Sequence, residues 1–205
     1  MAPAVGETEE PAEFRRAVEK MRAAAPRPEV VLEDMPRPRN LAPFSAAWSA
    51  DVVVDDEDLG SGRIVLLYAP DGHEAWEGRF RFVTLARAEL EPEMATDPLL
   101  PEVGWTWLTE ALHTHGARYV APSGTVSRAT SQGFGGLEGQ IARTEIEIRA
   151  SWTPVGDDLA EHLRAWVDLL CTCAGLPPVP PEPTPGEEGG DRVVPMPSRS
   201  ALRER

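Results

Sequence analysis

The 205-residue sequence has little cysteine, a single lysine and no long apolar run. Its two cysteines, Cys171 and Cys173, lie two residues apart in a predicted helix. Side chains at i and i+2 of a helix point to different faces, so we expect no disulfide between them. No segment approaches the roughly 20 apolar residues needed to cross a bilayer, and the N-terminus lacks the features of a secretory signal. We therefore expect a cytoplasmic protein without a membrane anchor.

Basic residues are also scarce relative to acidic ones. The chain has 34 acidic and 20 basic side chains, which gives a formal net charge of -14. Between residues 51 and 176 the 21 acidic residues outnumber the 9 basic ones, so this part carries -12. Binding to a nucleic-acid backbone requires clustered lysine and arginine, and this charge argues against it. A basic partner, or solubility alone, accounts better for an acidic surface.

Recognisable catalytic motifs are missing. There is no G-x-S-x-G elbow, and neither cysteine lies in a catalytic motif. The glycine-rich segment 133–139 is followed by a strand rather than a helix and contains Glu138, which does not suit a phosphate. We expect no catalytic residue in a conventional motif.

Metal-ligating residue types occur as two pairs with unusual spacing. His113 and His115 form an H-x-H pair, and the two cysteines form a C-x-C pair, neither of which is a zinc-ribbon spacing. Glu145 and Glu147 share one face of a predicted strand, where a charge ladder with Arg149 is favoured over an acid–base pair. The sequence therefore predicts no metal and no cofactor. A small-ligand or metal-dependent enzyme with a site near residues 127–139 stays as an alternative.

Hydrophobic periodicity predicts the order of secondary-structure elements. Five prolines in Pro26–Pro43 favour an extended strap lying over the domain. The pattern predicts helices at 11–24, 104–115 and 157–174, and strands at 44–54, 64–68, 75–89, 118–127 and 143–152, the first two strands joined through the acidic tip 55–62. In the last strand, apolar residues from Ile146 to Trp152 alternate with polar ones, which is typical of a sheet with one covered face.

These elements predict one α+β domain over residues 11–176. Its architecture is two-layered, with an antiparallel sheet of about five strands and helices packed on one face, in the order α-βββ-α-ββ-α. Residues 1–10, and the proline-rich tail 177–205 with its acidic residues and arginines, are predicted to be disordered.

The polar segment Ser127–Gly139 is the best candidate for recognition. It connects the last two predicted strands and combines hydrogen-bonding side chains with an aromatic residue, a composition suited to a peptide or small ligand. The candidate binding residues are Arg128, Thr130, Ser131, Gln132 and Phe134.

Four segments carry a family resemblance: Arg87–Leu100 (RAELEPEMATDPLL), Gly104–Leu112 (GWTWLTEAL), Ser123–Arg128 (SGTVSR) and Glu145–Pro154 (EIEIRASWTP). They resemble an actinobacterial family known as domain of unknown function number three thousand, over about Phe14–Pro178. The resemblance implies a cytoplasmic actinobacterial protein. It supplies no reaction, ligand or catalytic residue.

The function expected from these features is that of a non-enzymatic binding or adaptor domain. Its acidic surface and the 127–139 segment would recognise a protein or peptide partner, with no role for nucleic acid or membrane. Besides the enzyme named above, a secretion-chaperone-like protein that binds extended peptides is an alternative, because such folds share the predicted element order. The sequence does not identify the partner or the oligomeric state.

Overall fold

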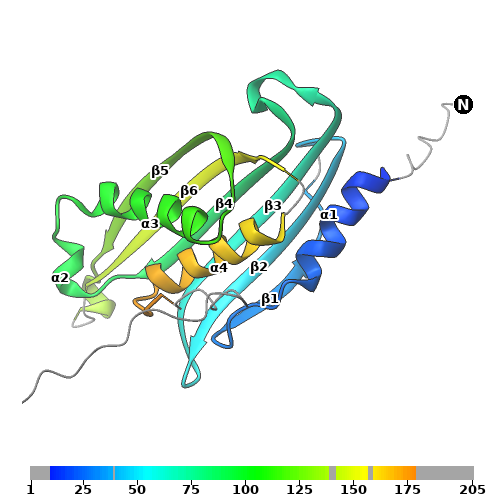
Figure 1. Cartoon of the computed structure of the whole chain (residues 1–205). Coiled ribbons are helices and arrows are strands. Elements are labelled where there is room, and N and C mark those ends of the chain that lie inside the picture. Colours follow the sequence, from blue (N-terminus) through cyan, green and yellow to red (C-terminus); the bar gives the residue numbers. More distant parts are fainter. Residues whose placement is uncertain (1–9, 39, 139–141, 157–158, 179–205) are drawn as a thin grey trace, which may run out of the picture.

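A computed structural model describes residues 10–38, 40–138, 142–156 and 159–178 of the chain. It consists of one six-stranded antiparallel sheet and helices on one side of that sheet (Figure 1). In chain order the elements are α1 (Ala12–Ala23), β1 (Val30–Met35), β2 (Phe44–Val54), β3 (Glu57–His73), β4 (Gly78–Glu89), α2 (Pro92–Ala95), α3 (Leu100–Thr114), β5 (Tyr119–Ser131), β6 (Arg143–Pro154) and α4 (Ala160–Cys173). Short 3-10 helices span Glu74–Trp76 and Gly135–Leu137.

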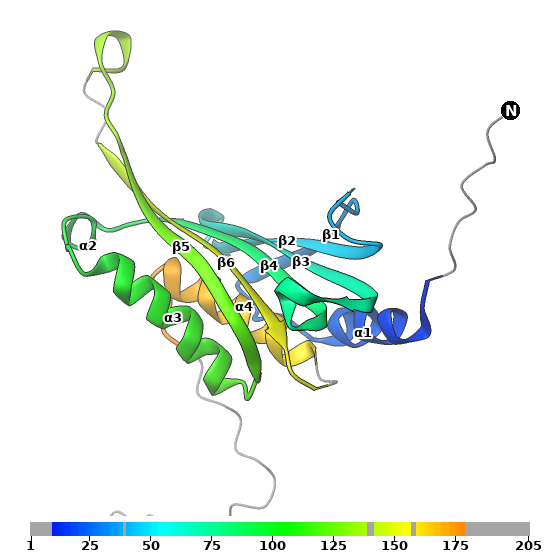
Figure 2. The same cartoon turned by 90° about the horizontal axis from the view of Figure 1, so that it is seen from above.

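The strands lie in the order β1-β2-β3-β4-β6-β5, and each neighbouring pair is antiparallel. Figure 2 shows α1, α3 and α4 together on one face, while the opposite face has no helix over it. The predicted two-layer α+β class is therefore confirmed. The sheet has six strands rather than about five.

The additional strand comes from the segment predicted to be a strap. Val30–Met35 is extended, as its proline-rich surroundings favour, but it pairs with β2 at the edge of the sheet. The prolines that flank it, Pro28 and Pro36, lie outside the strand, so all six of its residues keep a backbone N–H for pairing. The prediction of a strap over the domain was wrong for this stretch.

Strict alternation in β4 and β6 separates the two faces of the sheet. Phe82 is paired with Trp152, and Ala86 with Ile148, and all four side chains point into the core under the helices. The intervening residues point to the helix-free face. The last predicted strand, in which apolar and polar residues alternate, is confirmed as β6.

Helix α4 packs against the centre of the sheet because Gly62 of β3 has no side chain. A Cβ atom placed on Gly62 would lie 2.6 Å from Leu170 Cδ2 and 2.9 Å from both Trp166 Cζ2 and the Leu85 carbonyl oxygen. Trp166 and Leu170 are fully buried at this contact. The missing methyl group of Gly62 therefore sets how closely α4 approaches the sheet.

Helix α1 covers the other end of the core through an aromatic cluster. The ring of Phe14 lies 5.7 Å from that of Tyr68, which lies 4.6 Å from that of Phe80. The Tyr68 hydroxyl donates a hydrogen bond to Glu13 Oε2 at 2.8 Å. Burial, reinforced by this carboxylate, raises the pKa of Tyr68 above its usual value.

The acidic tip predicted between two strands is a tight turn at Asp55 and Asp56. Both residues have positive φ angles, 51° and 65°, as a two-residue hairpin turn with the sheet's natural twist requires. Aspartate tolerates this conformation better than most residues do.

Several predictions concern residues outside the described part of the chain. Disorder was predicted for 1–10 and 177–205, of which the structure describes only Glu10, Pro177 and Pro178. Among the described residues, no helix has the length and apolar character needed to cross a membrane.

The close contact between α4 and Gly62 gives a first prediction. We expect Gly62→Ala to lower the free energy of unfolding by about 1–3 kcal/mol, the usual cost of forcing an extra methyl group into a packed core. Gly136→Ala is the matched control, because a Cβ there meets nothing within 4 Å, and we expect a change below about 1 kcal/mol. Urea denaturation of both variants measures the difference. Equal stability of the two variants would contradict this account of the α4 contact.

Candidate functional site

The first five residues of the predicted recognition segment, Ser127–Ser131, are strand rather than loop. Strands β5 and β6 stay paired as far as Ser131 and Arg143, so β5 ends four residues later than predicted. Arg128, Thr130 and Ser131 therefore belong to the sheet, and the described part of the connection contains the 3-10 helix Gly135–Leu137. The result is a long hairpin that projects beyond the other strands (Figure 2).

The five candidate binding residues do not line one cavity. Arg128 lies on the helix side of β5, and its Nη1 donates to the Asp97 carbonyl oxygen at 3.1 Å. On the same side Thr130 Oγ1 lies 3.0 Å from Thr144 Oγ1, whereas Ser131 points to the opposite face by alternation. Gln132 and Phe134 follow in the connection, both exposed. These residues present an extended surface rather than a pocket.

The histidine pair His113 and His115 and the cysteine pair Cys171 and Cys173 form no metal-binding group among the described residues. His115 Nε2 lies 2.6 Å from Asp168 Oδ2, so this histidine links α3 to α4 instead of approaching a cysteine. Within the described ranges, no group of three or more histidine, cysteine, aspartate or glutamate side chains is placed to hold a metal. The carboxylates of Glu145 and Glu147 lie on the helix-free face, opposite to Arg128.

A groove of about 560 Å³ lies on the helix-free face of the sheet. It crosses β3, β4, β6 and β5, and sequence reasoning did not find it. Its lining residues are Arg63, Val65, Val83, Thr84, Leu85, Ser123, Gly124, Thr125, Arg149, Ala150 and Ser151.

Two rows of side chains across the strands form this groove. The strand register places Val65, Val83, Ser151 and Ser123 in one row. The next row consists of Arg63, Leu85, Arg149 and Thr125. The groove thus has an aliphatic floor on β3 and β4, hydroxyl groups on β5 and β6, and a guanidinium group on each side of Leu85.

Both charged groups of the lining are cations. Arg149 Nη2 lies 2.7 Å from Glu147 Oε1, and Arg87 Nε donates to the other carboxylate oxygen of Glu147 at 2.5 Å. This arrangement confirms the predicted charge ladder on β6. The Arg63 guanidinium makes no hydrogen bond or ion pair with any described residue. The groove is therefore locally positive in a chain whose net charge is -14.

A buried arginine supports the hydroxyl wall from within the sheet. Arg81 of β4 donates from Nη2 to Ser151 Oγ at 2.7 Å and to Ser123 Oγ at 3.2 Å. Its Nη1 donates to the Ala121 carbonyl oxygen at 2.8 Å and to Thr153 Oγ1 at 3.2 Å. Burial lowers the pKa of Arg81 from its usual value. Four hydrogen bonds compensate for this desolvation and hold β4, β5 and β6 in one arrangement.

The carbonyl oxygen of Ala121 is available because β5 is irregular at that point. The pairing with β6 shifts between Val120 and Ser123, and Ala121 adopts a positive φ of 48°. Such a bulge turns a backbone group out of the ladder. The signal in the sequence is Pro122, which cannot donate to a strand ladder.

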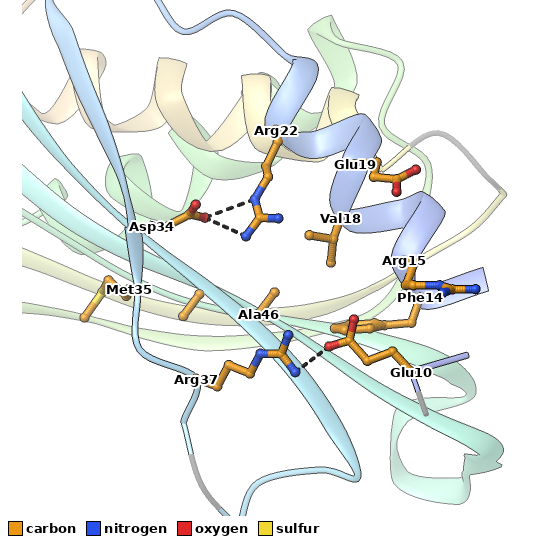
Figure 3. A pocket seen from close by; sticks show the side chains of 11 residues that line it. Glu10, Phe14, Arg15, Val18, Glu19, Arg22, Asp34, Met35, Arg37 and Ala46 are labelled. Carbon is orange, nitrogen blue, oxygen red and sulfur yellow. Dashed lines mark hydrogen bonds and ion pairs between the residues drawn. The ribbon is translucent and has the colours of Figure 1, made fainter. Parts of the chain in front are cut away.

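A second, smaller hollow of about 190 Å³ lies between α1 and the strands β1 and β2 (Figure 3). Phe14, Val18 and Ala46 supply its apolar part. Four of its charged side chains are paired with each other, Arg22 with Asp34 and Arg37 with Glu10. Arg15 and Glu19 also line it.

The Arg81 network predicts a large effect of a single substitution. Arg81→Met keeps the length of the side chain but leaves four acceptors without their donor, so we expect a loss of about 3–5 kcal/mol in the free energy of unfolding. Arg79→Met on the same strand is the control. Its exposed ion pair with Glu13 should contribute less than about 1 kcal/mol. Thermal or chemical denaturation that finds the two variants equally stable would refute the role of Arg81.

The cysteines give a prediction about reactivity. Burial raises the pKa of Cys171 to about 11 and that of Cys173 to about 12. Because the thiolate is the reactive species, we expect a chromogenic disulfide reagent to label neither thiol within minutes near neutral pH. Denaturing guanidinium should expose both for rapid labelling. Fast labelling of the folded chain would show that α4 opens readily.

Comparison with known proteins gives one match. Neither the curated proteins nor the solved structures include a match to this chain. The model of a family described as "Protein of unknown function (DUF3000)" matches residues 10–182. This range spans every helix and strand of the sheet described above, and the chain belongs to the DUF3000 family.

Proposed function

We propose that this protein is a non-enzymatic cytoplasmic binding domain that holds an extended segment of a protein partner in the groove on the helix-free face. One observation carries the proposal: aliphatic side chains lie uncovered in the middle of this face, between two arginines. Val83 is 37% exposed, whereas Phe82 and Thr84 on either side of it are buried. An apolar floor in a hollow with a few polar groups at its rim is the usual composition of a ligand site.

The groove specifies the chemistry of its partner. Val65, Val83 and Leu85 favour an aliphatic side chain, whose burial contributes about 1.5–3 kcal/mol. Arg63 and Arg149 favour a carboxylate next to it, because guanidinium groups form charge-assisted hydrogen bonds with carboxylates. The partner segment is therefore one in which an apolar and an acidic residue lie two positions apart, on the same face of the extended chain.

An extended segment fits the shape of the surface better than a helix does. The two rows of the groove run across four strands, and successive side chains of a strand-like segment point alternately down and up. The aliphatic floor and the arginines lie in adjacent rows, so they can take side chains from one short segment. The Arg81 network fixes the hydroxyl wall before binding, which lowers the cost of ordering it.

The lining itself disfavours catalysis. It contains hydroxyl and guanidinium groups but no histidine, cysteine, aspartate or glutamate. General acid–base or nucleophilic chemistry requires such a group near the bound molecule. The positive groove also differs from the acidic surface of the chain as a whole, so any contact with a basic partner would involve other parts of that surface.

Selection from a random peptide library on the immobilised full chain tests the proposal. We expect selected peptides to contain an aliphatic residue two positions from aspartate or glutamate and to bind in titrations with purified chain. Val83→Asp should weaken their binding at least about tenfold, because it places a carboxylate on the apolar floor. Arg63→Glu should do the same for acidic peptides through charge reversal.

Arg16→Glu is the matched control for the charge change. Arg16 is exposed on α1, on the helix side of the sheet, so binding should stay unchanged. Selected peptides that bind the Val83 and Arg63 variants as tightly as the unmodified chain would overturn the proposal. So would a selection that yields no peptide with measurable affinity.

A further inference from the structure

The two edges of the sheet differ in how they are protected from pairing with another strand. Strand β1 is only six residues long, carries Glu33 and Asp34, and has Pro28 and Pro36 just outside its ends. Short length, charge and proline are the features that prevent edge strands from associating. The β1 edge is therefore protected.

The β5 edge lacks this protection. From Ser123 to Ser131 the strand pairs with β6 without interruption, and its other edge pairs with no strand among the described residues. This stretch contains no proline and no acidic residue. Its one charged side chain, Arg128, is turned to the helix side, where it is bonded to the Asp97 carbonyl oxygen. The edge thus presents the outward-pointing backbone groups of a nine-residue stretch with almost no charge.

Exposed apolar side chains lie beside the same edge. Phe134, just beyond the end of β5, is 75% exposed, and Val120, at its start, is 37% exposed. Leu99, 56% exposed, lies two residues from Asp97, whose carbonyl oxygen receives Arg128. A free strand edge and uncovered apolar groups together indicate a protein interface.

We propose that two copies of this chain associate through their β5 strands, which pair antiparallel across a two-fold axis and join the two sheets into one. The symmetry of the edge identifies the second copy as the occupant: the exposed apolar residues Val120 and Phe134 lie seven residues on either side of Ser127, so a two-fold pair brings one toward the other. The β5 edge carries almost no charge, so it adds little repulsion between two chains of net charge -14. An antiparallel strand edge is also self-complementary, as a two-fold interface requires.

The uninterrupted stretch sets the register of the pair. Full overlap of Ser123–Ser131 with its copy places Ser127 opposite itself on the two-fold axis. The same register brings Phe134 of one copy toward Val120 of the other, so both exposed side chains become covered. The axis is perpendicular to the sheet, so both grooves open on the same side of the assembly.

Sedimentation velocity of the full chain tests this assembly. We expect a species of twice the chain mass of 22.3 kDa that dissociates on dilution. The double variant Ser127→Lys and Ala129→Lys places lysines on the exposed edge of each copy and should give only the single-chain mass. Val31→Lys on the β1 edge is the matched control and should leave the dimer intact. Circular dichroism verifies that each variant is folded.

Cross-linking tests the register. A short bismaleimide should join two copies of the Ser127→Cys variant, because the buried Cys171 and Cys173 do not compete for the reagent. Ser61→Cys, exposed on the same face but in β3, should give no linked dimer.

A single-chain mass at all concentrations would overturn the proposal, as would a dimer that survives both lysines or is lost in Val31→Lys. The test is independent of the proposed function, because the edge lysines leave the groove lining intact and the groove variants leave the edge intact.

Discussion

The close contact between α4 and the centre of the sheet is the constraint on which the rest of the structure depends. Ten of the fourteen residues of α4 are buried, and the contact at Gly62 lets Trp166 and Leu170 reach the strands. Helices α1 and α3 pack on either side of it, through the aromatic cluster around Tyr68 and through Gly104, which lies against Val126 and Ile146. The hydrophobic core cluster is thereby gathered on the helix side of the sheet.

A sheet covered on one face must stabilise the other face by different means. The helix-free face does so with cross-strand ion pairs such as Arg87–Glu147 and, in the wall of the groove, with the hydroxyl groups of β5 and β6. Arg81 is the exception, since it is a charged group at 7% exposure within this face. Its position is tolerable only because four acceptors surround it, and those acceptors lie on the two strands β5 and β6. The geometry of the groove wall is therefore a consequence of satisfying one buried cation.

The fold was largely predictable because alternation reports directly on a sheet with one covered face. The pattern around Ile146 and Ile148 identified β6, and helical spacing identified α1, α3 and α4. Strand β1 was not predicted, because the proline content of the whole segment favours an extended strap over the domain. The prolines lie outside β1, and its six residues contain none. The groove was beyond prediction from sequence. It depends on which residue of β3 lies opposite Val83, and on a bulge that turns the Ala121 carbonyl oxygen toward Arg81.

Charge is distributed over the molecule in a way that composition alone conceals. The chain is strongly acidic, yet the groove lining has two arginines and no carboxylate, and the β5 edge has almost no charge. Acidic residues elsewhere, such as the turn at Asp55 and Asp56, keep other surfaces apart by repulsion. The groove and the β5 edge thus carry less negative charge than the rest of the molecule. A negatively charged partner meets the least repulsion at these two surfaces. Strand β5 forms both one wall of the groove and one edge of the sheet. Pairing at that edge would therefore also make this wall of the groove more rigid.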